Sequence, residues 1–185
     1  IHYLGLHAAM KLTSSQTKSF QKTVYDHYKK SGRHSLPWRN KTVTPYQIMV
    51  SEIMLQQTQV DRVIPKYRAF LQTFPTAKKL AEANSQQVLK LWVGLGYNSR
   101  ALRLQKAAQV ITEVYKSRVP KTYDELLELP GIGPYTAAAI LNFAFDTYHP
   151  MLETNIRTVY IFHFLKNKKE ISEQELLTLI EQTSD

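Results

Sequence analysis

The chain has 185 residues, of which 43% are hydrophobic, so it can bury a core. Charged residues or Gln interrupt every apolar run, which excludes a membrane-spanning helix, and the lack of cysteine excludes disulfides, thiolate zinc sites and cysteine-ligated iron-sulfur clusters. The formal net charge of +9 favours a polyanion such as nucleic acid as partner. The alternative interpretation is a solvated surface that happens to be basic.

The first twelve residues, 1–12, lack the pattern of a signal peptide and are expected to be a leader or tag remnant outside the fold. Three helix starts are then marked by capping boxes, in which a Thr or Ser precedes a Gln or Glu by three residues. These boxes are 44–47, with Pro45 at the first helical position, 122–125 and 172–175.

Apolar residues recur every three or four positions in 88–92 and 102–111, which is the spacing of helices. We therefore predict an all-α protein, with breaks between helices at glycine or proline. The predicted breaks lie at Gly32, Pro37, Pro65, Pro75, Gly94 to Gly96, Pro120, Gly131 to Gly133 and Pro150.

The stretch "LELPGIGPYTAAAI" places Gly131 and Gly133 between two expected helices. Such a turn exposes the unpaired N–H groups at the start of the second helix, and glycine lets a phosphate approach closely. The carbonyls of Leu129 and Gly131 could also coordinate Na⁺ or K⁺. A simple tight helix connection is the alternative, and it is favoured for any isolated pair of glycines.

A second glycine turn, Gly94-Leu95-Gly96-Tyr97, also follows an apolar helix. The helix after it opens with Arg100 and Arg103, so this turn is interpreted as a second phosphate-binding candidate.

Glu52 lies in the middle of an apolar helical stripe in "TPYQIMVSEIMLQQTQV", between Ile48 and Met49 on the helical wheel and beside Gln56. A carboxyl group placed there loses water, so its pKa should rise and it can act as a general acid near neutral pH. A structural Glu held by backbone donors is the alternative.

Glu153 stands where another helix is expected to begin, so its negative charge is favoured there. One neutral and one charged carboxyl group match the division of labour in glycosidic bond cleavage. For Glu153 alone, a plain helix cap is the alternative.

Five blocks follow one another along this chain: "LPWR", "TPYQIMVSEIMLQQTQVDRVIPKYRAFLQTFP", "VLKLWVGLGYNSRA", "VPKTYDELLELPGIGPYTAAAI" and "LETNIRTV". In order and spacing they resemble the helix-hairpin-helix DNA glycosylases, and within them the adenine DNA glycosylases of the MutY type. The resemblance runs from about Leu36 to Phe164 and implies a six-helix barrel at 37–151 packed on a subdomain formed by 13–36 and 152–185.

The resemblance also implies roles for single residues. Glu52 matches the acid that protonates adenine, and Asn155 matches a polar residue near the sugar. Gln56, Gln57 and Tyr97 match residues that wedge into the duplex beside the extruded base. Together with the two turns, the residues expected to contact DNA are Arg39, Gln56, Gln57, Gly96, Tyr97, Arg100, Gly131, Gly133, Tyr135 and Thr136.

Three departures from the family pattern matter. Glu153 and Thr154 stand where the family usually has Asp and Gly, and Tyr135 stands where strand-cleaving relatives have a lysine, so no Schiff base is expected. The four cluster cysteines and the separate domain that reads oxidised guanine are not in this chain. We therefore expect no iron-sulfur cluster and no required cofactor.

The predicted function is a monofunctional base-excision-repair glycosylase that removes adenine opposite guanine or 8-oxoguanine. Glu52, Glu153, Tyr135 and Asn155 would form its catalytic site. Its partner would be double-stranded DNA with a mismatch or lesion, bound by a monomer in a prokaryotic cytoplasm, at the nucleoid and without membrane attachment. The alternatives are a pyrimidine glycosylase for G/T or G/U mismatches and a non-catalytic DNA-binding remnant.

Overall fold

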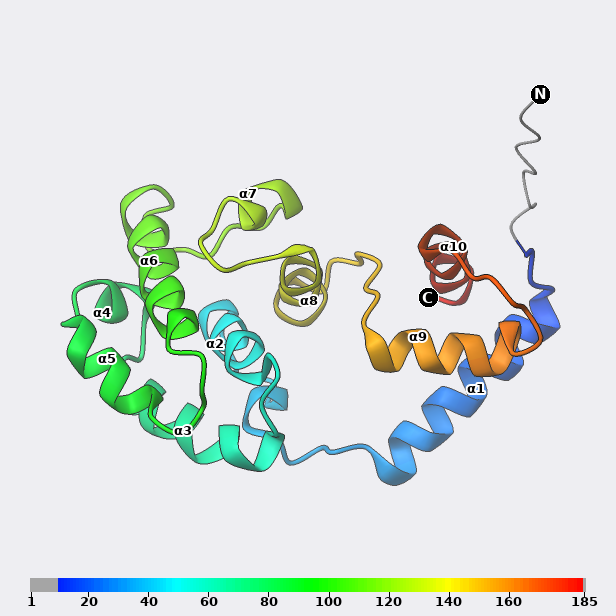
Figure 1. The fold of residues 1–185 in the computed structure, drawn as a ribbon, viewed down its shortest axis with the longest axis horizontal. Coiled ribbons are helices and arrows are strands. Elements are labelled where there is room, and N and C mark those ends of the chain that lie inside the picture. The colour runs from blue at the N-terminus through cyan, green and yellow to red at the C-terminus, as the bar shows by residue number, and fades with distance from the viewer. Residues whose placement is uncertain (1–9, 185) are drawn as a thin grey trace. The chain divides into compact units, whose positions relative to one another are not determined.

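The computed structural model describes residues 10–184, and every regular element in this range is a helix (Figure 1). The predicted all-α class is therefore confirmed. The chain divides into two compact units, one formed by residues up to Arg33 together with those from Pro150 onward, and one formed by His34–His149. No helix within 10–184 is long and apolar enough to cross a membrane.

Residues 1–9 of the expected leader 1–12 lie outside the described residues. Two of the described residues of that segment, Met10 and Leu12, bond to Gln182. The backbone N–H of Leu12 donates to Oε1 of Gln182 at 2.7 Å, and Nε2 of Gln182 donates to the carbonyl of Met10 at 3.0 Å.

The terminal unit is built from helices at both ends of the chain. Its core is a cluster of apolar side chains around Phe20, whose ring lies 5.1 Å from that of Tyr160 and 5.0 Å from that of Phe164. The elements are α1 (Ser14–Ser31), α9 (Thr154–Tyr160), the π-helical turn η2 (Ile161–Leu165) and α10 (Glu173–Thr183).

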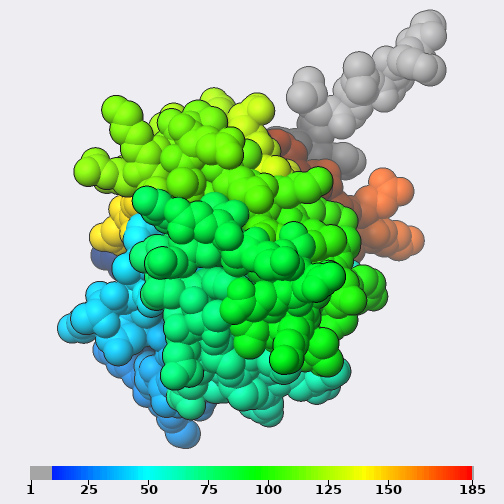
Figure 2. Space-filling view, turned by 90° about the vertical axis from the view of Figure 1, so that its left-hand side faces the viewer, coloured from blue at the N-terminus to red at the C-terminus, as the bar shows by residue number. Residues whose placement is uncertain are grey.

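The central unit holds the larger core and most of the predicted site. Figure 2 shows the face of this unit formed by the green helices α4, α5 and α6. Its elements are η1 (Pro37–Arg39), α2 (Pro45–Leu55), α3 (Val60–Thr73), α4 (Ala77–Ala81), α5 (Ser85–Trp92), α6 (Ser99–Glu113), α7 (Tyr123–Leu127) and α8 (Pro134–Phe145).

Helix α2 runs through the centre of this unit, where it packs against η1, α3, α6 and α8. Most of its side chains are buried, and these point in all directions around the helix axis rather than along one stripe. Any polar side chain in the middle of α2 is therefore placed in apolar surroundings.

The predicted capping motifs form to different extents. Thr44 and Gln47 make a full capping box, because each side chain accepts the other's backbone N–H. Thr122 and Ser172 cap their helices, but neither box is reciprocal. The carboxylate of Glu125 accepts the Thr122 hydroxyl, and that of Glu175 binds Lys168.

The predicted break at Pro65 is wrong, because Pro65 lies inside α3. Packing of Val63, Tyr67 and Phe70 into the core holds the helix on both sides of the proline. Tertiary burial therefore outweighs the local loss of one backbone hydrogen bond.

Candidate active site

Glu52 occupies the middle of α2 between fully buried neighbours. Ser51 and Ile53 are 0% and 1% exposed, and Glu52 itself is half-buried. Burial raises the pKa of Glu52 from its ordinary 4.5 to about 7, because water no longer stabilises the carboxylate. The carboxyl group is thus protonated in a large fraction of molecules at neutral pH, as a general acid requires.

Gln56 joins α2 to the glycine hairpin. It is the residue that ends α2, and its Nε2 donates to Oγ1 of Thr136 in the first turn of α8 at 3.3 Å. Thr136 is only 3% exposed. The end of the helix that carries Glu52 is therefore fixed to the start of the helix that follows the hairpin.

The hairpin joins α7 to α8 as the sequence predicts. Gly131 has φ +86°, and a Cβ there would lie 2.9 Å from Cβ of Arg103, so both the backbone conformation and the close approach of α6 require glycine. Gly133 precedes Pro134 at the N-terminus of α8, and a Cβ at Gly133 would meet no atom within 4 Å. The backbone beside Gly133 is therefore open to an approaching group.

A shallow hollow of about 480 Å³ lies on this hairpin. It combines the start of α8, where the helix dipole favours an anion, with the side chain of Arg103. The sequence analysis places Arg103 at the start of the helix after the second glycine turn. Its position beside the hairpin results from tertiary packing, which the sequence does not show. The lining residues are Gln56, Arg103, Gly131, Ile132, Gly133, Pro134, Tyr135 and Thr136.

The carbonyls proposed for a monovalent cation are partly engaged. That of Leu129 accepts the backbone N–H of Ile132 at 3.1 Å, which leaves one lone pair for another partner. Within residues 10–184, no group of three or more His, Asp or Glu side chains could hold a metal ion. The chain also has no thiolate that could ligate an iron-sulfur cluster, so its residues do not fit that group.

The second glycine turn, between α5 and α6, differs from the hairpin. Its carbonyls point toward arginine side chains: Gly94 accepts from Arg62 at 2.6 Å, and Leu95 and Gly96 accept from Arg100. The carbonyl oxygens of this turn therefore accept hydrogen bonds from one exposed and one buried arginine, which is unlike an anion-binding helix start.

Two predicted wedge residues lie beside these arginine contacts in the left-handed backbone region. Gln57 has φ +54° and Tyr97 has φ +48°, a conformation that costs energy for residues other than glycine. Both side chains are exposed, that of Tyr97 at 66%. The central unit thus presents one amide and one aromatic ring from adjoining loops.

Arg100, which the sequence predicts to contact DNA, points away from the surface in this structure. Arg100 is only 7% exposed, and its guanidinium group points into the unit, where it binds backbone carbonyls at the end of α2. The position of an arginine in the first turn of a helix does not reveal which way it points, because the acceptors come from a distant part of the chain.

Glu153 is the N-cap of α9. Its Oε1 accepts the backbone N–H of Ile156 at 2.9 Å, and its Oε2 accepts from Nδ2 of Asn155 at 3.2 Å. The predicted helix cap is therefore present, and it brings Asn155 and Glu153 together. These two residues belong to the terminal unit, whereas Glu52 belongs to the central one.

The remaining predicted residues lie on the surface of the central unit. Arg39 is exposed at the end of η1, which packs against α2. Tyr135 is 39% exposed in the first turn of α8 and lines the hairpin hollow.

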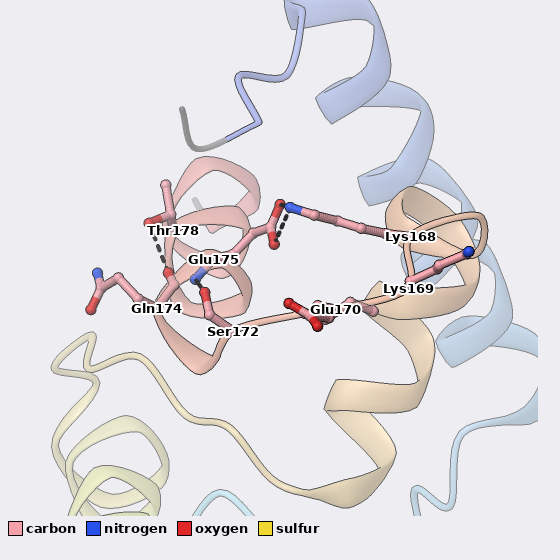
Figure 3. A pocket seen from close by; sticks show the side chains of 8 residues that line it. Lys168, Lys169, Glu170, Ser172, Gln174, Glu175 and Thr178 are labelled. Carbon is pink, nitrogen blue, oxygen red and sulfur yellow. Dashed lines mark hydrogen bonds and ion pairs between the residues drawn. The ribbon is translucent and has the colours of Figure 1, made fainter. Parts of the chain in front are cut away.

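A wider pocket of about 700 Å³ lies in the terminal unit, and none of the predicted site residues lines it. Figure 3 shows its main polar contact, in which Nζ of Lys168 lies 2.6 Å from Oε1 of Glu175. Glu175 is 8% exposed, so this ion pair joins the loop after η2 to α10. Its acid and base neutralise each other, which does not resemble the isolated acid at Glu52.

Comparison with known proteins identifies the family to which the chain belongs. Residues 50–182 match the model of the HhH-GPD superfamily of base excision DNA repair proteins. The chain belongs to this superfamily. Its fold is similar to that of a thermostable thymine-DNA glycosylase, with a TM-score of 0.81, 28% sequence identity, and coverage of 91% of this chain and 78% of that one. An endonuclease III–DNA complex shares the fold, with a TM-score of 0.69 and 17% identity over 94% of this chain and 84% of that one.

Curated relatives of this HhH-GPD chain include two bacterial adenine DNA glycosylases. That of Buchnera aphidicola is 40% identical over 168 residues, which cover 88% of this chain and 47% of the relative. That of Mycolicibacterium smegmatis is 47% identical over 135 residues, which cover 73% of this chain and 45% of the relative. The chain therefore spans about half the length of the curated relatives that it matches.

Proposed function

We propose that this protein is a DNA glycosylase that removes adenine mispaired with guanine or 8-oxoguanine. The observation that carries the proposal is the half-buried Glu52, whose pKa of about 7 suits a general acid at neutral pH. Relatives with 40% and 47% identity named adenine DNA glycosylase support adenine as the base.

In the proposed reaction, the carboxyl group of Glu52 donates its proton to a ring nitrogen of the extruded adenine. The bond between C1′ of the sugar and the base breaks, and its electron pair leaves with the base. The negative charge of Glu153 stabilises the cationic sugar, and Asn155 orients that carboxylate through the bond of 3.2 Å. Water then adds to C1′ and releases a proton.

The proposed DNA contacts come from the central unit. The phosphate near the extruded nucleotide would bind at the hairpin, to the start of α8 and to Arg103. Gln56, Gln57 and Tyr97 would fill the space that the base leaves. The net charge of +9 supports binding of duplex DNA by displacement of counterions.

Tyr135 supports a monofunctional enzyme, because a phenol cannot form the Schiff base through which a lysine cleaves the strand. We propose that product strands remain intact until alkali is added. We also propose that the protein acts as a monomer at the nucleoid of a prokaryote and requires no cofactor.

A pyrimidine-directed mismatch glycosylase is the second candidate. It is favoured by the similarity in fold to the thymine-DNA glycosylase, at a TM-score of 0.81. Adenine is preferred because the "SEIMLQQTQV" block supplies an acid suited to a purine ring nitrogen.

A single assay separates these candidates. Duplexes with A opposite 8-oxoguanine, A opposite G, T opposite G and U opposite G are incubated with the protein, and free base and alkali-labile sites are measured. Release of adenine alone supports the proposal, release of thymine or uracil supports the second candidate, and binding without release indicates a DNA-binding remnant.

A further inference from the structure

The guanidinium group of Arg100 is a buried centre of hydrogen bonding at the junction of two loops. The four N–H groups of its two Nη atoms are shared among six neutral oxygen atoms at distances between 2.6 and 3.2 Å, whereas its Nε is buried without a hydrogen-bond partner in the described structure. Burying a cation without a carboxylate partner is costly, so these oxygens must compensate for lost water. The acceptors are the carbonyls of Ile53, Met54, Gln56, Leu95 and Gly96 and the hydroxyl of Thr58.

These acceptors flank the two residues with left-handed backbone. Nη1 binds the carbonyl of Gln56 at 2.6 Å and Nη2 binds the hydroxyl of Thr58 at 3.1 Å, so Gln57 is held from both sides. Nη2 also binds the carbonyl of Gly96 at 3.1 Å, immediately before Tyr97. The guanidinium carbon lies 5.6 Å from the centre of the Tyr97 ring, within cation–π range.

Strained backbone persists only where the surrounding structure determines it. The hydroxyl of Thr58 also lies 3.2 Å from the carbonyls of Gln56 and Leu95, so the two loops are bound to each other as well as to Arg100. Without the guanidinium group, the Thr58 hydroxyl still joins the loops and Trp92 still binds the carbonyl of Gly96, but the bond of 2.6 Å to the carbonyl of Gln56 and the bond of 3.1 Å to the carbonyl of Gly96 are lost. Gln57 and Tyr97 are then less firmly held in their left-handed conformation.

Gln105, one and a half turns further along α6, provides an internal comparison. It is also buried, at 3% exposed, and its side chain binds the carbonyl of Ala83 at 2.7 Å and the hydroxyl of Ser85 at 2.8 Å. These partners join α4 to α5, where no predicted site residue lies. Arg100 and Gln105 thus stabilise the same helix, but only Arg100 holds the loops with Gln57 and Tyr97.

We propose that Arg100 is a positioning residue that holds Gln57 and Tyr97 in the conformation in which they enter the duplex. This inference rests on the proposed function, because it concerns the step in which a base is extruded. Arg100 touches neither the base nor the sugar. Because Arg100 already orders the two loops, the protein does not lose their conformational entropy when the base leaves the stack.

The main test is Arg100→Lys, which keeps a positive charge but cannot reach six acceptors. Extrusion is followed by stopped-flow fluorescence of 2-aminopurine placed next to the mispaired adenine, and base release is followed under single-turnover conditions. We expect both rates to fall by about tenfold or more on an A opposite G mismatch. On a duplex in which the adenine faces an abasic site, extrusion is easier, so the decrease in both rates should be clearly smaller.

Gln105→Leu is the matched control, because it removes a buried polar side chain from the same helix. It should lower the melting temperature but leave extrusion and release within about threefold of the unmodified protein. Thr58→Val is a milder variant that removes one acceptor of Arg100 while keeping the side-chain shape. We expect it to slow extrusion by about fivefold or more, beyond the range allowed for the control. Thr58→Val therefore provides the test if Arg100→Lys does not fold.

The outcomes separate this inference from the proposed function. If the unmodified protein releases no base, the proposed function fails, and the fluorescence signal still measures extrusion. If Arg100→Lys keeps the extrusion and release rates of Gln105→Leu, or if its rates fall by the same factor on both duplexes, Arg100 is only structural and the inference is overturned. Unchanged extrusion by a folded Thr58→Val protein overturns it as well.

Discussion

Glu52 and Glu153 are held in contrasting ways. Glu52 lies in the middle of a central helix, where burial raises its pKa to about 7. Glu153 begins a helix on the other unit, and both of its oxygens accept hydrogen bonds, from the backbone of Ile156 and the amide of Asn155. Burial disfavours charge on the carboxyl group of Glu52. The carboxylate of Glu153 instead serves as a hydrogen-bond acceptor at a helix start.

The contrast shows how a helical scaffold can assign opposite roles to one residue type. A side chain in the middle of a buried helix has little contact with water, and the backbone N–H groups around it are already bonded within the helix. A position at the start of a helix supplies unpaired N–H groups and a favourable dipole. The proposed acid and the proposed stabilising anion therefore differ in environment rather than in chemistry.

The largest expected effect is that of Glu52→Gln. The amide keeps the shape of the side chain but has no proton of suitable acidity to donate, so base release should fall by about a thousandfold or more while duplex binding stays within a fewfold. Single-turnover release and an equilibrium binding titration measure the two quantities. Glu113→Gln, the same change at an exposed position, is the control and should leave both unchanged. Normal release by a folded Glu52→Gln protein would remove Glu52 as the acid.

Glu153→Gln tests the other side of the comparison. Loss of the negative charge beside the cationic sugar should slow release by on the order of a hundredfold, with little change in binding. The cap itself should cost at most about 1–2 kcal/mol in the free energy of unfolding. Release rates and thermal melts are measured together. If only the melting temperature changes, Glu153 is a helix cap and not part of the catalytic pair.

The raised pKa of Glu52 also predicts how stability depends on pH. Between its ordinary value of 4.5 and about 7, the folded protein holds a proton that the unfolded chain has lost, so the free energy of unfolding falls as pH rises through this window. The full shift corresponds to about 3 kcal/mol, and partial exposure of the carboxyl group makes the effect smaller. Denaturant unfolding at several pH values should show this loss, and Glu52→Gln should remove it. An unchanged pH dependence in the variant would contradict the burial of a neutral carboxyl group.

Much of the fold follows from local signals in the sequence. The cap at Thr44 and the glycine at position 131 are set by backbone chemistry that neighbouring residues determine, so they could be predicted. Glu52 does lie among buried residues, but α2 is buried around its whole axis and not along the single apolar stripe that the helical period predicts. Pro65 shows the limit of such rules, because core packing on both sides carries the helix through it.

The site was less predictable where it depends on distant contacts. Arg100 turns inward because carbonyls at the end of α2 lie 44 to 47 positions away in the sequence, and no local pattern marks them. Arg103 joins the hairpin for a similar reason, since α6 packs against Gly131.

The smallest expected effect is that of Glu153→Asp, which separates charge from reach. Asp is among the best N-cap residues and keeps the negative charge, so the melting temperature should hardly change. Because its arm is shorter by one methylene, the bond of 3.2 Å to Asn155 is the contact most exposed to loss. We expect release within about threefold of the unmodified protein, because charge near the sugar contributes more than one side-chain hydrogen bond. Asn155→Ala, measured beside it, should match the Asp variant if the lost bond is the cause of any decrease. A loss as large as that of Glu153→Gln would mean that the position of the carboxylate, and not its charge alone, determines the rate.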